Sequence, residues 1–403
     1  MDRNTFLNQH WTSYPAMPAD AKAAGRIYQI VREAGELEIT LIRDGKEQIV
    51  SFEKAPPQSE FLIEGDIVAA VSATELILLA PNKAALPNRT YNKDILEKWN
   101  RYVEEVRHFF RRKDFVEVKT PSLVVCPGTE PSLDVFLTEL KVGSRKEKLY
   151  LPTSPELHLK KALALGAEKI FEIAPCFRNG EVTERHQPEF NMLEWYRAYD
   201  NLGTIKQDVI DLVQHLVKVL KFPAPRKILS YSVAELFKIH CGFDFTPETT
   251  KEELKALAQK LNVDVHSAES IDDFFFLIFM EKIESQLHGE DLIFVEKYPP
   301  YQAALARLTP DGWGDRFEAY WQGLELCNAF HELNDPQIQR QRSEEDLEKK
   351  QQSHKEMIAL DPEFFQCLDA GLPPSGGVAL GVERLFMALH GIRNISDISV
   401  FPK

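Results

Sequence analysis

Residues 177–196 read FRNGEVTERHQPEFNMLEWY, and this stretch decides how the rest of the chain is interpreted. As a hairpin it would place Arg178 opposite the return strand and leave a loop that can close over a ligand. A guanidinium suits phosphate through bidentate hydrogen bonds, and the aromatic face of Phe190 suits a purine. An ordinary surface hairpin would explain one arginine and one phenylalanine, but the whole string favours a nucleotide site.

Residues 315–335 carry regularly spaced carboxylates. Glu318, Glu325 and Glu332 recur every seven residues, which puts them on one helix face or on alternating faces of strands. Carboxylates gathered in a cleft hold magnesium or recognise an ammonium group. Solvated surface glutamates are the alternative for any one of them.

Residues 376–389 read GGVALGVERLFMAL, in which small residues lead into an apolar helix with Arg384 in its first turn. A strand-to-helix junction of this kind brings backbone N–H groups and a guanidinium close to a phosphate. A glycine-rich turn that only packs the helix is the alternative. The sequence contains neither GxGxxG nor GxxxxGK[ST], which excludes the dinucleotide and P-loop interpretations.

The chain divides into two predicted domains. Alternating apolar residues over 25–52, 66–71 and 75–80 predict five short strands, with a turn at Asp44 and Gly45, and hence a small β-barrel of the OB type within residues 1–87. Residues 81–87 are a predicted linker, and the second domain is expected over 88–403. It opens with a helix over 93–113 and a strand over 115–121. Further helices are predicted over 249–262 and 337–358, the second with a solvated face.

Composition limits the function classes. The 403 residues carry a net charge of -14, which argues against a chain that grips nucleic acid along a broad face. No apolar run long enough for a membrane span and no leader peptide are evident, so we expect a cytoplasmic protein that does not bind membranes. The five cysteines lack CxxC pairing and are interpreted as buried free thiols, without a disulfide or a zinc site: Cys126, Cys176, Cys241, Cys327 and Cys367.

Three segments of the chain resemble motifs 1, 2 and 3 of class II aminoacyl-tRNA synthetases. Residues 115–121 with the helix before them resemble motif 1, residues 177–196 motif 2, and residues 377–384 motif 3, over about 315 residues in the same order. The resemblance implies an α+β core with a mixed, mainly antiparallel sheet flanked by helices. Within this class, TSPE at 153–156, RHQPEF at 185–190 and NAFHEL at 328–333 are most similar to the lysine branch.

The resemblance also implies roles for individual residues, with ATP as a substrate and Mg²⁺ as a cofactor. The catalytic arginines would be Arg178 and Arg384. The nucleotide would be bound by Arg178, Glu181, Arg185, His186, Phe190, Glu325 and Arg384. The amino acid would be bound by Ser154, Glu156, Glu194, Tyr196, Asn328, Glu332 and Ala379, with Glu156 near its amino group and Glu194, Tyr196 and Glu332 around a distal ammonium. Magnesium would be held by Glu318 and Glu325.

The acceptor of the activated amino acid is a separate question. QAALA at 302–306, His331 and Ala379 resemble the elongation factor P lysine ligases, synthetase paralogues that attach (R)-β-lysine to a lysine of that factor. Ala379 and Cys327 would reshape the pocket around the substrate backbone, or are simple packing variants. Residues 1–87 contain eight Lys and Arg and twelve Asp and Glu. Their net charge of -4 does not favour RNA binding by this part of the chain.

The resemblance therefore implies a ligase that uses lysine or (R)-β-lysine with elongation factor P as its protein partner, and motif 1 implies a homodimer. A compact lysyl-tRNA synthetase charging tRNA is the first alternative, and an inactive synthetase-like binding protein the second. Three features depart from the family pattern. Gly180 stands before Glu181 where a glutamate is usual, Glu383 replaces an aspartate, and an N-terminal barrel is not common in these ligases.

Overall fold

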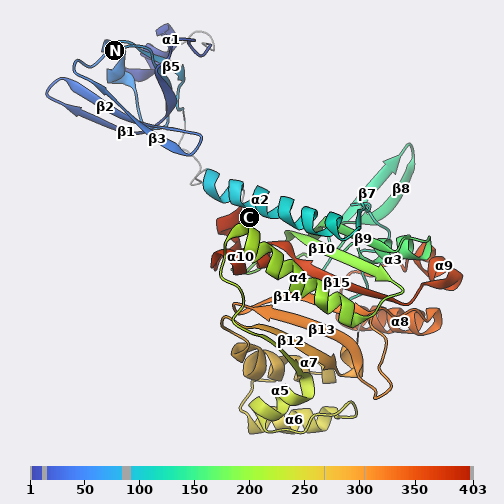
Figure 1. Cartoon of the computed structure of the whole chain (residues 1–403). Helices are drawn as coiled ribbons and strands as arrows, with labels where there is room; N and C mark the ends of the chain where they lie inside the picture. Colours follow the sequence, from blue (N-terminus) through green and yellow to red (C-terminus); the bar gives the residue numbers. More distant parts are fainter. Residues whose placement is uncertain (1, 11–15, 84–91, 267, 304, 400–403) are drawn as a thin grey trace. The chain divides into compact units, whose positions relative to one another are not determined.

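The computed structural model describes residues 2–10, 16–83, 92–266, 268–303 and 305–399. Its contacts divide the chain into two compact units, with the division between Trp99 and Asn100. Figure 1 colours the strands of the first unit blue and those of the second from cyan to red. The domain boundary that we predict at residues 87 and 88 lies outside the described residues, as does most of the predicted linker.

The first unit contains a five-stranded antiparallel sheet in the order β3-β2-β1-β4-β5. Its elements are α1 (Arg3–His10), β1 (Ala23–Glu33), β2 (Glu36–Arg43), β3 (Lys46–Phe52), β4 (Ile67–Ala70) and β5 (Leu76–Ala80). Asp44 and Gly45 both have positive φ, the conformation that a tight hairpin turn needs. Ile27, Leu37 and Val68 are buried in its apolar core. The five predicted strands are confirmed, and closure into a barrel stays a prediction.

The second unit is α+β and is built on an eight-stranded sheet in the order β11-β12-β13-β14-β15-β10-β9-β6. Its strands are β6 (Val116–Glu117), β9 (Lys169–Phe177), β10 (Glu189–Ala198), β11 (Ile228–Ser232), β12 (Leu292–Tyr298), β13 (Gly314–Trp321), β14 (Leu324–His331) and β15 (Ser375–Gly381). The β6–β9 and β11–β12 pairs are parallel and the other neighbours antiparallel. A separate hairpin joins β7 (Leu137–Val142) to β8 (Arg145–Tyr150).

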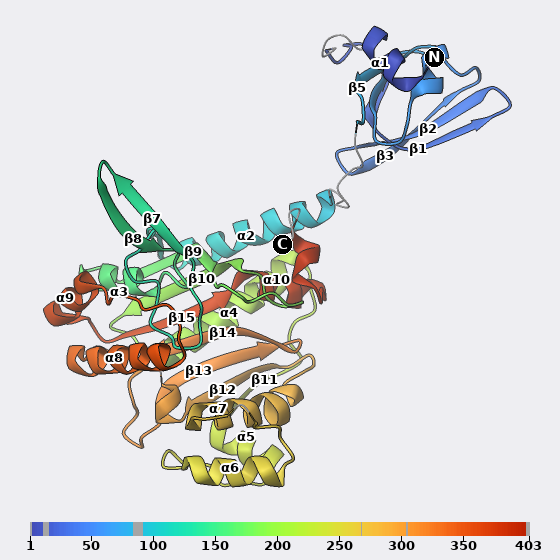
Figure 2. The same cartoon turned by 180° about the vertical axis from the view of Figure 1, so that it is seen from behind.

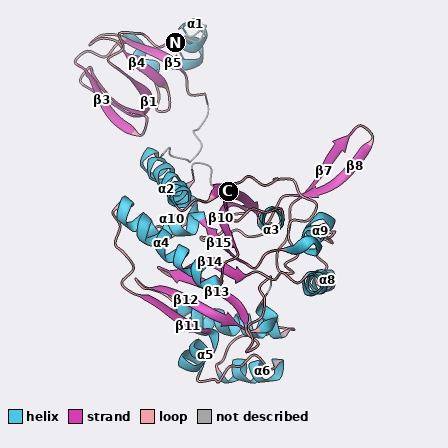
Figure 3. Cartoon of the chain, turned by 45° about the vertical axis from the view of Figure 1, so that its right-hand side comes forward, coloured by secondary structure: helices cyan, strands magenta, loops and turns pink. Residues whose placement is uncertain are grey.

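Helices flank this sheet, as Figures 2 and 3 show. Against β10, β14 and β15 pack α4 (Leu202–Leu220) and α10 (Val382–His390). Beside them runs α2 (Lys93–Arg112). Elsewhere α3 (Glu156–Ala164) packs on α9 (Pro362–Gly371), which contacts α8 (Pro336–Gln352). An apolar cluster beside β11 and β12 is formed by α5 (Val233–Cys241), α6 (Lys251–Lys260) and α7 (Ile271–Ile278).

Two predictions about these elements need correction. The strand expected over 115–121 is reduced to the two residues of β6, and Phe115 ahead of it packs on the ring of Phe110. The helix expected over 337–358 ends at Gln352; as α8 it has the expected solvated face, with Gln341 and Glu345 exposed, and it buries Gln339, Ser343 and Lys350 on the other face. A polar face can be buried when it lines a polar cavity, and α8 does so.

Candidate active site

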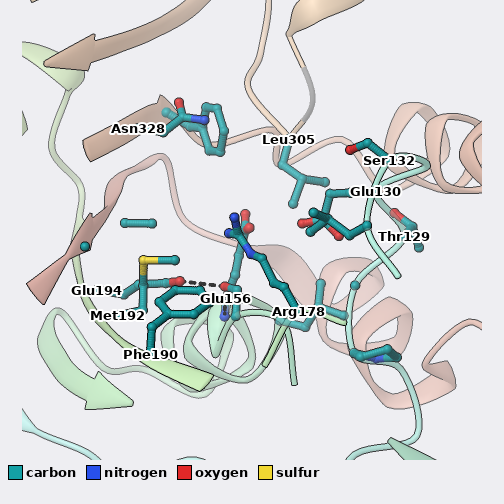
Figure 4. Close-up of a pocket in the computed structure, with 18 of the residues that line it drawn as sticks. Thr129, Glu130, Ser132, Glu156, Arg178, Phe190, Met192, Glu194, Leu305 and Asn328 are labelled. Atoms are coloured by element: carbon teal, nitrogen blue, oxygen red, sulfur yellow. Dashed lines mark hydrogen bonds between the residues drawn. The ribbon is translucent and has the colours of Figure 1, made fainter. Parts of the chain in front are cut away.

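The hairpin of β9 and β10 positions an arginine beside an aromatic ring. Glu189 pairs with Phe177 in the sheet, and the backbone N–H of Arg178 donates to Pro188 O at 3.0 Å, so Arg178 leaves β9 where Phe190 enters β10. The guanidinium carbon of Arg178 lies 5.1 Å from the centre of the Phe190 ring (Figure 4). Gly180 has a φ of +82°, which explains a glycine where the family usually has a glutamate.

Alternate residues of β10 face a cavity of about 330 Å³, a volume within the usual range for small-molecule sites. Leu193 and Trp195, on the other face of the strand, are fully buried in the protein. The cavity brings together twelve of the residues predicted from the sequence: Ser154, Glu156, Arg178, Glu181, Arg185, His186, Phe190, Glu194, Glu325, Asn328, Ala379 and Arg384. Tyr196, Glu318 and Glu332 are not part of its lining.

One end of the cavity is formed by Arg384, His186 and Glu325. Arg384 Nη2 donates to His186 Nε2 at 2.5 Å, and its Nη1 lies 3.2 Å from Glu325 Oε2. Burial and the charge of Arg384 lower the pKa of His186, which favours the neutral ring that accepts this hydrogen bond. Arg185 also lines this region and donates to Gly323 O at 3.2 Å.

The glutamate that replaces an aspartate in the third motif has a structural role. The carboxylate of Glu383 accepts hydrogen bonds from the backbone and the side chain of Asn191, at 3.0 and 2.7 Å. The contact ties the start of α10 to the residue that follows Phe190. The longer side chain of Glu383 therefore fits at this position, and it holds β10 in place beside the ring of Phe190.

A second region of the cavity is acidic and is centred on Glu194. Ser154 Oγ donates to Glu194 Oε1 at 2.5 Å, and the hydroxyl of Tyr196 donates to Oε2 at 3.2 Å. Burial, with the charge of Glu156, raises the pKa of Glu194 to about 8. With this raised pKa, Glu194 is largely protonated at neutral pH. A ligand cation close to Glu194 would lower the pKa and ionise the carboxyl group.

The sequence reasoning missed a buried lysine in the same region. Lys160 Nζ lies 2.6 Å from Glu156 Oε1 and 2.6 Å from Glu332 Oε2, and its side chain is 1% exposed. Burial alone lowers the pKa of Lys160, but the two carboxylates outweigh it and raise the pKa. Lys160 follows Glu156 by one helical turn, a spacing that could have revealed this ion pair.

This ion pair also involves Glu332, which stays a predicted substrate-binding residue. Its Oε2 lies 2.6 Å from Lys160 Nζ, and its Oε1 is buried and has no hydrogen-bond partner in the described parts of the chain. A Cβ atom on Gly377 would lie 2.3 Å from Glu332 Oε1 and 2.3 Å from the ring of Tyr196. Only glycine fits at this position of β15.

A third wall of the cavity comes from residues 126–133 and from α8. Thr129 Oγ1 donates to Asp346 Oδ2 at 3.4 Å, and Lys350 Nζ donates to Leu133 O at 2.7 Å. Burial raises the pKa of Asp346 to about 6 and also raises the pKa of Glu130. The sequence analysis did not single out any of these residues, because nothing in a polar helix indicates that its polar side chains are buried.

Four buried polar atoms of residues that line the cavity have no hydrogen-bond partner in the described parts of the chain: Arg178 Nε, Asn328 Oδ1, Glu130 Oε2 and Gln339 Oε1. Buried polar groups are normally paired, so such atoms indicate where a polar ligand would bind. The set offers one donor and three acceptors.

The two residues predicted to hold magnesium have different environments. Glu325 lines the cavity, whereas Glu318 accepts hydrogen bonds from Tyr298 and Tyr320 at 2.6 Å each and pairs with Arg316. Burial raises the pKa of Glu318, and the charge of Glu325 adds to the shift. Oxygen donors of this kind suit Mg²⁺. Over the described residues, no group of three or more candidate ligands gathers at one point.

Some residues resemble the elongation factor P lysine ligases more than the tRNA synthetases. They differ in whether they line the cavity. Ala379 and Cys327 line the cavity, and Ala379 pairs with Glu194 on one side and Asn328 on the other. His331 instead contacts Asp315 at 2.9 Å, and Gln302 donates to Asp272 at 2.9 Å, both outside the lining. Ala304 of the same tract lies outside the described residues.

The thiols and the helices add two further findings. Four of the five predicted free thiols are buried, and Cys367 is half-buried.

In the portion of the chain that the structure describes, no helix has the length and apolar character to cross a membrane.

Comparison with known proteins identifies relatives of this chain. Residues 79–403 match the family described as tRNA synthetases class II (D, K and N). A protein of Haemophilus influenzae strain PittGG named elongation factor P–(R)-β-lysine ligase is 38% identical over 313 residues, which cover 77% of this chain and 94% of that protein. The proteins of the same name from Erwinia tasmaniensis and Haemophilus ducreyi are 37% and 35% identical, over 74% and 76% of this chain and 91% and 93% of their own lengths.

Proposed function

The chain belongs to the class II tRNA synthetases of the D, K and N type, and on this premise we propose that it activates lysine or (R)-β-lysine with ATP and transfers it to a lysine of elongation factor P. The activity in the names of its relatives is the basis for this acceptor. The observation that carries the proposal is one cavity in which Arg178 lies over Phe190 and Glu194 faces the same space.

The first step forms an aminoacyl-adenylate. The carboxylate of the amino acid attacks the α-phosphorus of ATP, an oxygen–phosphorus bond forms, and pyrophosphate leaves. Arg178 would contact the α-phosphate and the carboxylate while adenine stacks on Phe190, and Arg384, Arg185 and His186 would orient the outer phosphates. The protein accelerates the step by positioning the reactants and by stabilising the charge that develops on the phosphate.

The second step transfers the aminoacyl group. The uncharged amine of the acceptor lysine attacks the carbonyl carbon, an amide bond forms, AMP leaves, and the amine loses a proton. No covalent bond to the protein is needed in either step. Asn328 would hold the substrate carboxylate, and Ala379 and Cys327 would shape the space around its backbone.

Magnesium is proposed as the metal that accompanies ATP, and when bound it would neutralise phosphate charge. Glu325 faces the cavity and would contact it. Glu318 could join after exchanging one of its present partners, because Tyr298, Tyr320 and Arg316 already occupy its oxygens.

The remaining proposals concern the whole molecule. A closed OB-type barrel in the first unit, a cytoplasmic location and a homodimer formed through the first motif all follow from the resemblance and from composition. The net charge of -4 over residues 1–87 supports a protein acceptor over tRNA.

An exchange assay followed by two acceptor assays tests the function. Pyrophosphate exchange should depend on lysine or (R)-β-lysine, and labelled amino acid should then appear on elongation factor P. Efficient charging of tRNA without labelling of elongation factor P would instead identify a compact lysyl-tRNA synthetase. Absence of exchange with either amino acid would identify an inactive binding protein.

A further inference from the structure

The loop between β9 and β10 carries Arg185 and His186, and a single threonine contacts both of them. The backbone N–H of Thr183 donates to His186 O at 3.1 Å. Its Oγ1 accepts from the backbone N–H of Arg185 at 3.1 Å and lies 2.9 Å from His186 Nδ1. Thr183 is exposed and does not line the cavity, whereas Arg185 and His186 do. Thr183 therefore acts on a ligand only through these two residues.

The contact between Thr183 and Arg185 fixes the course of the chain. A threonine oxygen that accepts from the N–H two residues later forms an ST-turn, which orders a loop without strand pairing. The loop is also held from outside, because the backbone N–H of Ile395 donates to Glu184 O at 2.8 Å. The loop thus has a defined position although it lies outside the pairing of β9 with β10.

The contact between Thr183 and the ring decides where His186 carries its proton. A guanidinium can only donate, so the 2.5 Å contact of Arg384 Nη2 with Nε2 requires an unprotonated Nε2. The proton of the neutral ring then lies on Nδ1 and is donated to Thr183 Oγ1. The tautomer of a histidine is generally set in this way, by the hydrogen bond that the other ring nitrogen makes.

A neutral hydroxyl is the appropriate acceptor at Nδ1. The charged groups that act on His186 most strongly are Arg384, Glu181, Arg178 and Glu325. Among the described residues, however, the ring forms hydrogen bonds only with Thr183 and Arg384. A carboxylate in the place of Thr183 Oγ1 would favour the doubly protonated ring, which cannot accept from Arg384.

We propose that Thr183 is a positioning residue that fixes the Nδ1–H tautomer of His186, so that Nε2 holds the guanidinium of Arg384 in the nucleotide site. The inference rests on the proposed function for the identity of the nucleotide, ATP. Arg384 is then in place before ATP arrives, which leaves less ordering for the binding step. The same hydroxyl orders the backbone of Arg185, whose Nη1 donates to Gly323 O at 3.2 Å.

NMR of protein labelled with 15N-histidine reads the tautomer directly. Spectra would be recorded at pH 8, where the lowered pKa of His186 leaves its ring neutral, and His186→Gln would identify its signals. We expect a protonated Nδ1 and an unprotonated Nε2 in the unmodified chain. Thr183→Val keeps the branched shape but removes the acceptor, so both signals should move toward those of the opposite tautomer. Thr183→Ser should leave them in place.

Exchange kinetics test the consequence for ATP. In Thr183→Val the KM for ATP should rise about 3- to 10-fold, the usual effect of one lost hydrogen bond, while kcat at saturating ATP stays within about twofold. Thr183→Ser should keep the KM of the unmodified chain. Thr204→Val is the matched control, because it also loses a side-chain hydrogen bond, to Asp200 at 2.5 Å, away from the cavity lining. It should change neither the His186 signals nor the KM.

The outcomes separate the tautomer from the function. A protonated Nε2 in the unmodified chain would overturn the inference, and so would an unchanged His186 signal or an unchanged KM in Thr183→Val. Equal effects of Thr183→Ser and Thr183→Val would also overturn it, because the loop would then depend on the bulk of threonine and not on its hydroxyl. Unchanged signals of the other histidines would show that Thr183→Val is folded.

Failure of the proposed function gives a different result. If the unmodified chain shows no exchange with any amino acid while His186 carries its proton on Nδ1 and loses this preference in Thr183→Val, the proposed function is wrong. The assignment of Thr183 as the residue that fixes the tautomer is then supported on its own.

Discussion

Arg384 donates a hydrogen bond to His186 Nε2 at 2.5 Å, so the ring can accept it only while this nitrogen carries no proton. The pKa of His186 is lowered in the folded protein by burial and by Arg384. The stability that this pair contributes is therefore present above the unfolded pKa of about 6.5 and is lost as pH falls through the lower folded value.

The first prediction follows from this pair. Exchange activity should fall on the acid side as His186 gains a proton, because two cations would then face each other. His186→Gln retains a carbonyl acceptor that does not titrate, so its acid limb should be flatter, with about a 10-fold lower maximum. Rates measured from pH 5 to 8 in both proteins check this, and superimposable profiles would contradict it.

The second prediction concerns proton release at Glu194. Because its pKa is raised to about 8, this carboxyl carries a proton in most molecules at pH 7, and a bound ammonium would expel that proton. Calorimetry in buffers of different ionisation enthalpy should show the release of up to about one proton per diamino acid bound, with affinity rising from pH 6 to 8. Glu194→Gln and 2-aminohexanoate serve as controls that release none at this residue.

The third prediction concerns the stability of the second unit. Lys160→Met leaves Glu156 and Glu332 buried without their cation and should lower the free energy of unfolding by about 3–5 kcal/mol. Urea titration measures the change. Lys238→Met is the control, because its pair with Asp244 is largely exposed and should contribute less than about 1 kcal/mol. Equal losses in the two variants would show that Lys160 is not held as described.

The fourth prediction concerns Gly377. The methyl group of Gly377→Ala would meet Glu332 and Tyr196 at 2.3 Å each, so we expect a loss of about 1–3 kcal/mol in stability and weaker binding of the amino acid. Gly203→Ala, in α4, is the comparison: its Cβ would meet only the side-chain oxygen of Asn201 at 3.0 Å. A fully active, fully stable Gly377→Ala protein would be incompatible with this packing.

The hairpin and the elements around it could be predicted from the sequence because their signals are local. Residues 177–196 predict the hairpin of β9 and β10, and a glycine-rich stretch marks the junction of β15 with α10. The regular spacing of Glu318, Glu325 and Glu332 left helix and strands as alternatives, and the structure places the first two on β13 and β14. The meeting of β10, β14 and β15 in one sheet comes from long-range pairing, which no spacing reveals.

The site residues that could not be predicted are polar side chains that are buried by partners far away in the sequence. Lys160 looks like a surface lysine until Glu332 comes close to it from another element. Glu130 and Asp346 look solvated for the same reason, and the cavity they line is completed by α8. Charge patterns alone do not distinguish a helix that faces water from one that faces a polar cavity.

The strict alternation along β10 limits which length changes the chain could tolerate. Residues between Gly180 and Gln187 lie outside the strand pairing, so an insertion there would leave Phe190 in register with β9 and Glu194 in register with β15. A single residue inserted within β10 ahead of Glu194 would instead turn Trp195 toward the cavity and Glu194 toward the opposite face. Strand pairing thus fixes the length of β10, whereas the length of the loop is limited by the contacts of Arg185 and His186 with the cavity.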